Sequence, residues 1–129
     1  MPRHPSSKPT DVELKILDVL WRQGPRTVRQ VHNELAAERD TGYSTTLKMM
    51  QVMREKGLII RDDSVRPQLY HSAETMEHTQ LCMLDDLAQR AFGGSAANLV
   101  MRMISADRVS PEELEMMQEL IKKAREEDQ

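Results

Sequence analysis

The sequence predicts a mostly α-helical protein with one small β-hairpin. Three segments with helix-start signals come first, a short pair of strand-like segments follows, and the rest of the chain is helical and acidic. At 129 residues the chain is long enough for one ordinary domain or two small ones. Aromatic residues make up only 3% of it, so leucine, isoleucine, valine and ten methionines must supply the core.

The first helix is predicted to start at Thr10, which forms a capping box with Glu13. Its apolar residues recur at helical spacing: Leu14, Leu17 and Trp21, flanked by Ile16 and Leu20. Gly24 and Pro25 end it. We expect Trp21 to anchor the core, and stacking of Trp21 on a ligand is the alternative.

A second helix is predicted from Thr27, with Gln30 as its capping partner three residues on. Its apolar stripe consists of Val28, Val31 and Leu35. His32 lies beside this stripe. Because no second ligand lies at helical spacing from it, we expect a partly buried histidine and not a metal ligand.

Residues 42–58, GYSTTLKMMQVMREKGL, predict a third helix with two different faces. Ser44 is the expected N-cap, and Gly57 is the expected left-handed residue after the last turn. At about 100° per residue, one face is suited to burial: Thr46, Met49, Met50 and Met53, with Gly57. The other carries Ser44, Thr45, Lys48 and Val52. Hydroxyls, one ammonium and one methyl-bearing side chain suit phosphates, base edges and thymine methyls in the major groove of DNA.

A β-hairpin is predicted directly after this helix, with strands at 58–60 and 68–72 and a polar loop at 61–67. Three helices followed by a hairpin is the order of a winged helix-turn-helix, with the loop as the wing. We therefore assign residues 10–73 to a winged-helix DNA-binding domain. Residues 1–9 are interpreted as a disordered leader, or as an arm that touches DNA through Arg3 and Lys8.

Residues 74–129 are predicted to form a helical dimerisation domain. Ser95 can cap its second helix, and Ser110 with Pro111 and Glu113 starts its third. The candidate interface residues are Leu84, Leu87, Leu99, Met103, Leu114, Met117 and Ile121. A unit this small buries too little surface to be stable alone, so we expect a homodimer. The alternative is a monomer whose helices fold back on the N-terminal domain.

Charge is distributed unevenly along the chain, whose net charge is −3. Residues 1–72 hold 12 basic and 9 acidic residues, a net +3, whereas residues 73–129 hold 6 and 12, a net −6. A protein that is acidic overall can therefore still carry a basic binding half. A surplus of +3 predicts few phosphate contacts.

The sequence gives no indication of a membrane protein, a metal-binding protein or an enzyme. The sequence has no run of 18 apolar residues and its start has no apolar signal segment, so we expect no membrane insertion. One cysteine, Cys82, fits a reducing cytoplasm. His78 and Cys82 share a helix face, but two ligands do not make a metal site. We find no glycine-rich phosphate loop and no catalytic set, so we expect neither an enzyme nor a cofactor.

Two blocks carry a resemblance: ELKILDVLW at 13–21, and YSTTL with KGL within 43–58. With the tail motifs FGGS and SPEELEMMQELI they resemble the penicillinase-repressor (BlaI/MecI) family over most of residues 10–123. The resemblance implies a cytoplasmic homodimer whose winged helices bind a palindromic operator and repress transcription. It places the third helix in the major groove. The DNA-binding residues that it implies are Ser44, Thr45, Lys48, Val52, Tyr43 and Gln51, with Arg61 and Arg66 on flanking phosphate.

Relatives differ in how they release DNA. Some are cleaved after a membrane sensor peptidase detects a β-lactam, but the asparagine–phenylalanine pair at their cleavage point is replaced here by Arg102 and Met103. Cleavage by that peptidase or another protease therefore stays open. Copper-responsive relatives use a cysteine-rich tail, which this chain lacks. The alternative function is a winged-helix protein-interaction module without DNA binding.

Overall fold

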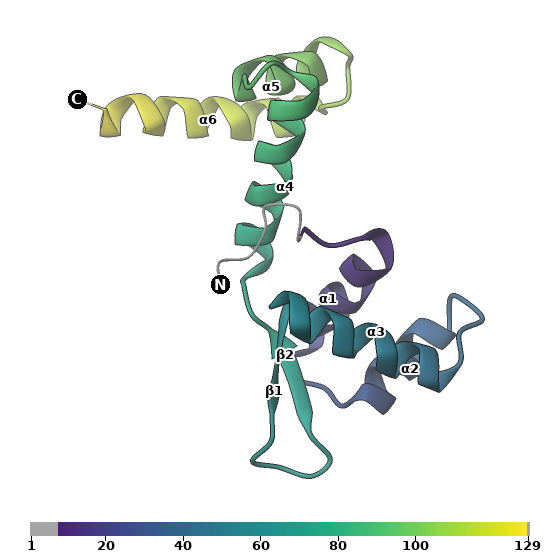
Figure 1. Cartoon of the computed structure of the whole chain (residues 1–129). Helices are drawn as coiled ribbons and strands as arrows, with labels where there is room; N and C mark the ends of the chain where they lie inside the picture. The colour runs from purple at the N-terminus through teal and green to yellow at the C-terminus, as the bar shows by residue number, and fades with distance from the viewer. Residues whose placement is uncertain (1–7, 129) are drawn as a thin grey trace. The chain divides into compact units, whose positions relative to one another are not determined.

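The computed structural model describes residues 8–128, so Arg3 and most of the predicted leader lie outside the described residues. The elements in order are α1 (Asp11–Gln23), α2 (Val28–Ala36), α3 (Tyr43–Lys56), β1 (Ile59–Asp62), β2 (Leu69–Ser72), α4 (Met76–Ala91), α5 (Ala96–Ser105) and α6 (Pro111–Glu127) (Figure 1). The predicted fold class, a winged helix-turn-helix followed by helices, is confirmed. Two compact units divide the chain, an N-terminal unit (Met1–Met83) and a C-terminal unit (Leu84–Gln129).

Both predicted capping boxes at the start of the chain are confirmed. The Glu13 amide donates to Thr10 Oγ1 at 3.3 Å, and the Thr10 amide donates to Glu13 Oε1 at 3.0 Å. Thr27 and Gln30 make the same reciprocal bonds at the start of α2. Helix α1 ends at Gly24, whose φ of 82° is readily accessible only to glycine.

The start of α3 differs from the prediction. Gly42 is the N-cap, so the assignment of Ser44 is wrong. The Thr46 amide donates to the Gly42 carbonyl at 3.2 Å, which begins the helical ladder two residues earlier than expected. Ser44 is thereby placed inside the first turn with its side chain exposed. The end is as predicted, because Gly57 adopts the left-handed conformation at φ 82° and ψ 17°.

The core of the N-terminal unit gathers residues from α1, α2, α3 and the hairpin. Met50, Met53 and Thr46 are fully buried on the inner face of α3, as predicted, and Met49 is half-buried against them. The other buried members are Ile16, Leu17, Val19, Leu20, Val28, Val31, Leu35, Ile59 and Tyr70. Burying one such Met, Leu or Ile side chain stabilises the fold by roughly 1.5–3 kcal/mol. The core therefore determines which face of α3 points outward.

The hairpin is longer than predicted. Strand β1 continues through Arg61 and Asp62, which pair with Tyr70 and Leu69 in the antiparallel register. The predicted loop at 61–67 was thus wrong at its start. Arg26 forms an isolated antiparallel β-bridge with Tyr70. Its amide donates to the Tyr70 carbonyl at 3.0 Å, and its carbonyl accepts from the Tyr70 amide at 2.8 Å.

Trp21 links α1 to the end of the hairpin. It packs against the core, as predicted, and its Nε1 donates to Ser72 Oγ at 2.9 Å and to the Glu74 carbonyl at 3.1 Å. A buried indole N–H is normally satisfied in this way. The bonds hold the chain where it leaves β2.

The C-terminal unit consists of well-capped helices that bury little within one chain. Ser95 and Ser110 cap α5 and α6 as predicted, accepting from the Asn98 and Glu113 amides at 3.0 and 3.1 Å. Ala88 is the buried residue of this unit among those that the structure describes. No helix in the described part of the chain is long and apolar enough to cross a membrane.

Candidate nucleic-acid interface

The outer face of α3 is exposed and uncovered by the rest of its unit. Ser44, Thr45, Lys48 and Gln51 are exposed, and the side chain of Val52 is 39% exposed. Ser44, Thr45, Lys48 and Val52 line an open groove of about 380 Å³ together with Met49 and Glu13. The structure thus brings the four outward residues predicted from the helix period into one surface.

The inner face of α3 is fixed to α2 by a polar contact as well as by the core. His32 Nδ1 lies 3.0 Å from Thr46 Oγ1, and Thr46 is fully buried. This contact satisfies a hydroxyl that would otherwise cost free energy in the core. His32 is half-buried as predicted, and it sets how α3 lies on the helix before it.

Tyr43 belongs to a cluster at the start of α3. The Arg29 guanidinium carbon lies 4.0 Å from the centroid of the Tyr43 ring, and His32 meets that ring edge-on at 5.7 Å. Tyr43 is half-buried, so part of its ring is covered by these neighbours and part is exposed to solvent. The stacking of Arg29 on Tyr43 was not predicted from the sequence, because the two residues lie on different helices.

The far end of α3 is held by an ion pair. Lys56 Nζ lies 3.0 and 2.9 Å from the two carboxylate oxygens of Glu13, whose side chain is 7% exposed. Glu13 thus completes the capping box of α1 and ties α1 to the last turn of α3. The sequence did not reveal this pair because the two residues are 43 positions apart.

The N-terminus of α3 leaves its first amides open. Of the helices in residues 8–128, it is the one whose start has no side-chain cap; Thr10, Thr27, Thr75, Ser95 and Ser110 cap the others. Its first turn also lacks an acidic residue. Open amides and the helix dipole favour an anion such as a phosphate at this end.

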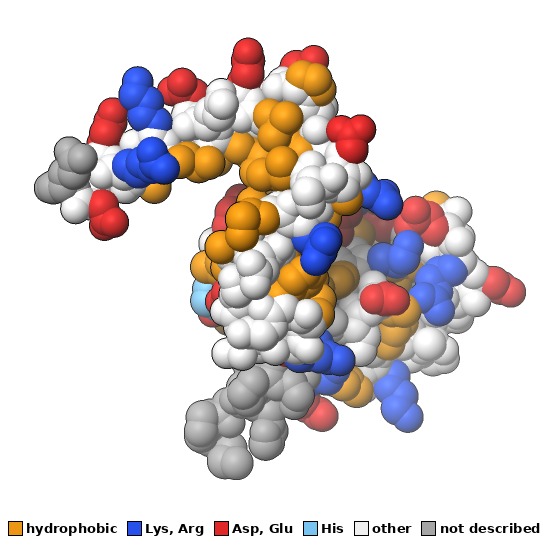
Figure 2. All heavy atoms as spheres, turned by 90° about the horizontal axis from the view of Figure 1, so that it is seen from above, with side chains coloured by type: hydrophobic (Ala, Val, Ile, Leu, Met, Phe, Trp, Pro, Cys, Tyr) orange, Lys and Arg blue, Asp and Glu red, His pale blue; other side chains and the backbone are white. Residues whose placement is uncertain are grey.

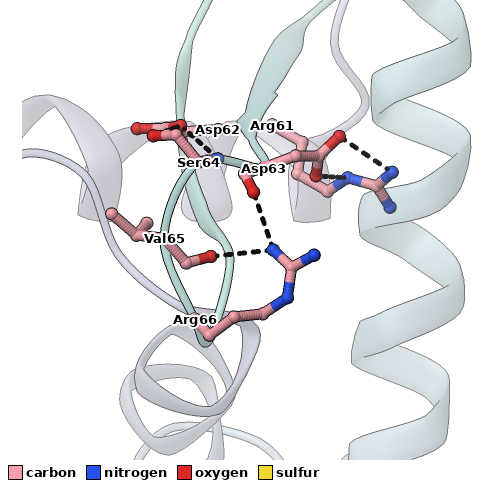
Figure 3. Close-up of polar contacts among 6 residues, drawn as sticks. All are labelled: Arg61, Asp62, Asp63, Ser64, Val65 and Arg66. Carbon is pink, nitrogen blue, oxygen red and sulfur yellow. Dashed lines mark hydrogen bonds and ion pairs between the residues drawn. The ribbon is translucent and has the colours of Figure 1, made fainter.

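The wing carries both signs of charge (Figure 3). Arg61 is paired with Asp63, Nε to Oδ1 at 2.6 Å and Nη2 to Oδ2 at 3.3 Å. Arg66 is exposed, and its Nη1 donates to the carbonyls of Asp63 and Val65 at 2.7 and 3.0 Å.

The tip of the wing contains a turn in which Asp62 is hydrogen-bonded to Ser64. Asp62 Oδ1 accepts from the Ser64 amide at 2.9 Å and from its hydroxyl at 2.6 Å. These bonds hold the pKa of the Asp62 carboxyl below its ordinary value. The wing thus contains two arginines and two aspartates, so its formal net charge is zero.

Apolar side chains, shown in orange, gather on the surface of the helical C-terminal part of the chain (Figure 2), and the residues predicted to form a dimer lie on these helices. Leu84, Leu87, Met103 and Ile121 are between 46% and 52% exposed, and Leu114 is 36% exposed. Leu99 and Met117 are half-buried. The most exposed apolar residues were missed from the sequence: Met116 and Leu120, at 66% and 67%, form a second stripe beside the predicted seam of α6.

The one cysteine lies on α4. Its Sγ is 3.6 Å from His78 Nε2, and Glu74 approaches the same nitrogen at 3.8 Å. Within residues 8–128 no group of three or more such side chains is arranged to hold a metal ion.

Comparison with known proteins agrees with this geometry. The penicillinase repressor family model matches residues 9–123. The transcriptional regulator BlaI of Mycobacterium tuberculosis, in strains CDC 1551 and H37Rv, is 35% identical over 111 residues, covering 83% of this chain and 78% of that regulator. The matched family is described as a repressor and the matched relative as a transcriptional regulator. The chain therefore belongs to the penicillinase repressor (BlaI/MecI) family.

Proposed function

We propose that this chain is a cytoplasmic repressor that binds a palindromic operator as a homodimer and blocks transcription. In this proposal α3 lies in the major groove with Ser44, Thr45, Lys48, Gln51 and Val52 toward the bases and nearest phosphates. Tyr43 and the open amides of α3 lie at the entrance of the groove. Arg29, Arg61 and Arg66 are the cations available for flanking phosphates.

The observation that carries this proposal is the division of α3 into two faces. Its inner face is fully buried at Thr46, Met50 and Met53. Its outer face exposes the hydroxyls of Ser44 and Thr45 and the ammonium of Lys48, and the start of the helix at Gly42 has no side-chain cap. Glu13, which lines the same groove, is buried and paired with Lys56. A protein-docking face would be more apolar or more acidic, so this surface favours DNA over the alternative interaction module.

The dimer is supported by the apolar surface of the C-terminal unit. A folded monomer rarely exposes a contiguous apolar patch of many large side chains. Here the exposed large residues recur on α4, α5 and α6, at Leu84, Leu87, Met103, Leu114 and Leu120. A second copy brings the same stripes and completes a core that one chain lacks. Two-fold symmetry then accounts for a palindromic operator.

A protease partner is not part of the proposal. Arg102 and Met103 lie within α5 and not in a loop. Proteases cut extended segments at exposed loop tips, and a bond within a helix must first open. Release of DNA by cleavage at this point would therefore require α5 to unfold locally.

Selection of duplexes from a random DNA library tests the proposed function. We expect the full chain to enrich a palindrome whose half-sites are separated by one helical turn of DNA, or by a multiple of it. The most constrained positions of each half-site should be those that face Lys48 and its neighbours. Enrichment of no motif, or of a single unrepeated half-site, would contradict a dimeric operator-binding repressor.

A further inference from the structure

The wing holds one of its two arginines in a closed ion pair. Arg61 Nη2 donates to Asp63 Oδ2 at 3.3 Å, and Arg61 Nε lies 2.6 Å from Asp63 Oδ1 but is buried and makes no hydrogen bond. The side chain of Arg61 is only 28% exposed, whereas that of Asp63 is 53% exposed. The pair is therefore an ion pair with one hydrogen bond, and a guanidinium binds a phosphate through the same donors. Asp63 thus compensates the charge of Arg61 and occupies the Nη2 donor that a phosphate of the DNA backbone would otherwise use.

The cross-strand neighbour of Arg61 fixes where its guanidinium lies. Arg61 is opposite Tyr70 in the register, and Tyr70 is buried. Hydrogen bonding to Asp63, and secondarily to Tyr70, raises the pKa of the guanidinium above its ordinary value. Arg61 therefore stays charged and held near the strand. Arg66 differs, since its contacts are to loop carbonyls that leave its charge uncompensated.

We propose that Asp63 restrains DNA binding by competing with phosphate for Arg61, and that Arg61 exchanges the Asp63 carboxylate for a backbone phosphate when the wing meets DNA. Asp63 then limits how much the wing contributes to the affinity for DNA. Since phosphates carry no sequence information, the restraint acts mainly on sequence-independent binding. This inference rests on the proposed DNA-binding function.

Asp62 supplies a matched control. It is adjacent to Asp63 and exposed, and it carries the same charge. Its carboxylate is bonded to Ser64 and not to an arginine in the described structure. Asp62→Asn keeps an oxygen for the Ser64 turn and removes one negative charge. A general electrostatic effect of the wing would therefore appear equally in Asp62→Asn and Asp63→Asn.

The experiment measures binding of the full chain to a duplex of unrelated sequence over a salt series. For Asp63→Asn we expect roughly two- to five-fold tighter binding per wing at low salt. The slope of log affinity against log salt should steepen by about 0.9 for each phosphate that Arg61 gains. Asp62→Asn should change affinity less and leave the slope as it is. In an Arg61→Gln background, Asp63→Asn should behave like Asp62→Asn.

Three results would overturn the inference or its basis. Equal effects of the two aspartate substitutions would show general charge removal, and persistence of the Asp63→Asn effect without Arg61 would exclude the exchange. Either would leave the proposed function intact. Absence of salt-dependent DNA binding by the unsubstituted protein would instead contradict the proposed function itself. Thermal melting of each variant confirms that the exposed wing substitutions leave the fold unchanged.

Discussion

Replacement of Leu120 by glutamate is expected to dissociate the dimer and weaken operator binding by roughly 10²- to 10⁴-fold. That range is the gain that a linked second binding site ordinarily provides through effective concentration. Leu120 is 67% exposed within one chain, so its replacement should cost an isolated chain little. In a dimer whose interface runs along α6, the same glutamate would be buried without a partner, which costs several kcal/mol.

Gln118→Glu is the control for this variant. It adds the same charge to the same helix, at a position about 200° around the helix axis from Leu120, and Gln118 is exposed. Sedimentation equilibrium should show a dimer for the unsubstituted chain and for Gln118→Glu, and a monomer for Leu120→Glu. A monomeric unsubstituted chain at micromolar concentration, or a Leu120→Glu variant that remains dimeric, would contradict the proposed interface.

Removal of the Lys48 ammonium is expected to have the next largest effect. Lys48→Ala should weaken binding of each half-site by roughly 5-fold or more, since a good base or phosphate contact of this kind is worth about 1–3 kcal/mol. Because Lys48 is exposed, stability should change by no more than about 0.5 kcal/mol. A slope against salt that is shallower by about 1 would assign Lys48 to a phosphate, and an unchanged slope would assign it to a base edge.

Lys15→Ala is the matched control. Lys15 is also exposed, at 51% of its side chain, but it lies on α1 near Glu38 and away from the groove of α3. Its removal should leave DNA affinity within about two-fold, the range of a change without direct contact. If Lys48→Ala lowers the melting temperature by several degrees, or if both lysines affect affinity equally, the assignment of the α3 faces is wrong.

Local signals in the sequence predicted most of this fold. The capping boxes at Thr10, Thr27 and Ser110 involve residues three positions apart, so a short motif contains all the information needed. The two faces of α3 likewise follow from a period of 3.6 residues. The failure at Ser44 is also local. A serine is a good cap in general, but here Gly42 accepts the first helical bond and the helix begins before the serine is reached.

Contacts between distant residues could not be predicted in the same way. The bridge from Arg26 to Tyr70, the Lys56–Glu13 pair and the His32–Thr46 contact all depend on how packed elements meet. The Arg61–Asp63 pair is close in sequence, yet it depends on how far the β1 ladder extends. These contacts hold α3 and the wing in place, and they depend on packing that local sequence patterns do not describe.

Operator binding is tested most directly by a salt series of binding to the selected palindrome and to a scrambled duplex of the same composition. Six to eight phosphate contacts predict a slope of log affinity against log salt of about −5 to −7. The palindrome should also be bound roughly 10³-fold or more tightly than the scrambled duplex at physiological salt. A flat series, or equal affinity for the two duplexes, would contradict the account of this chain as an operator-binding repressor.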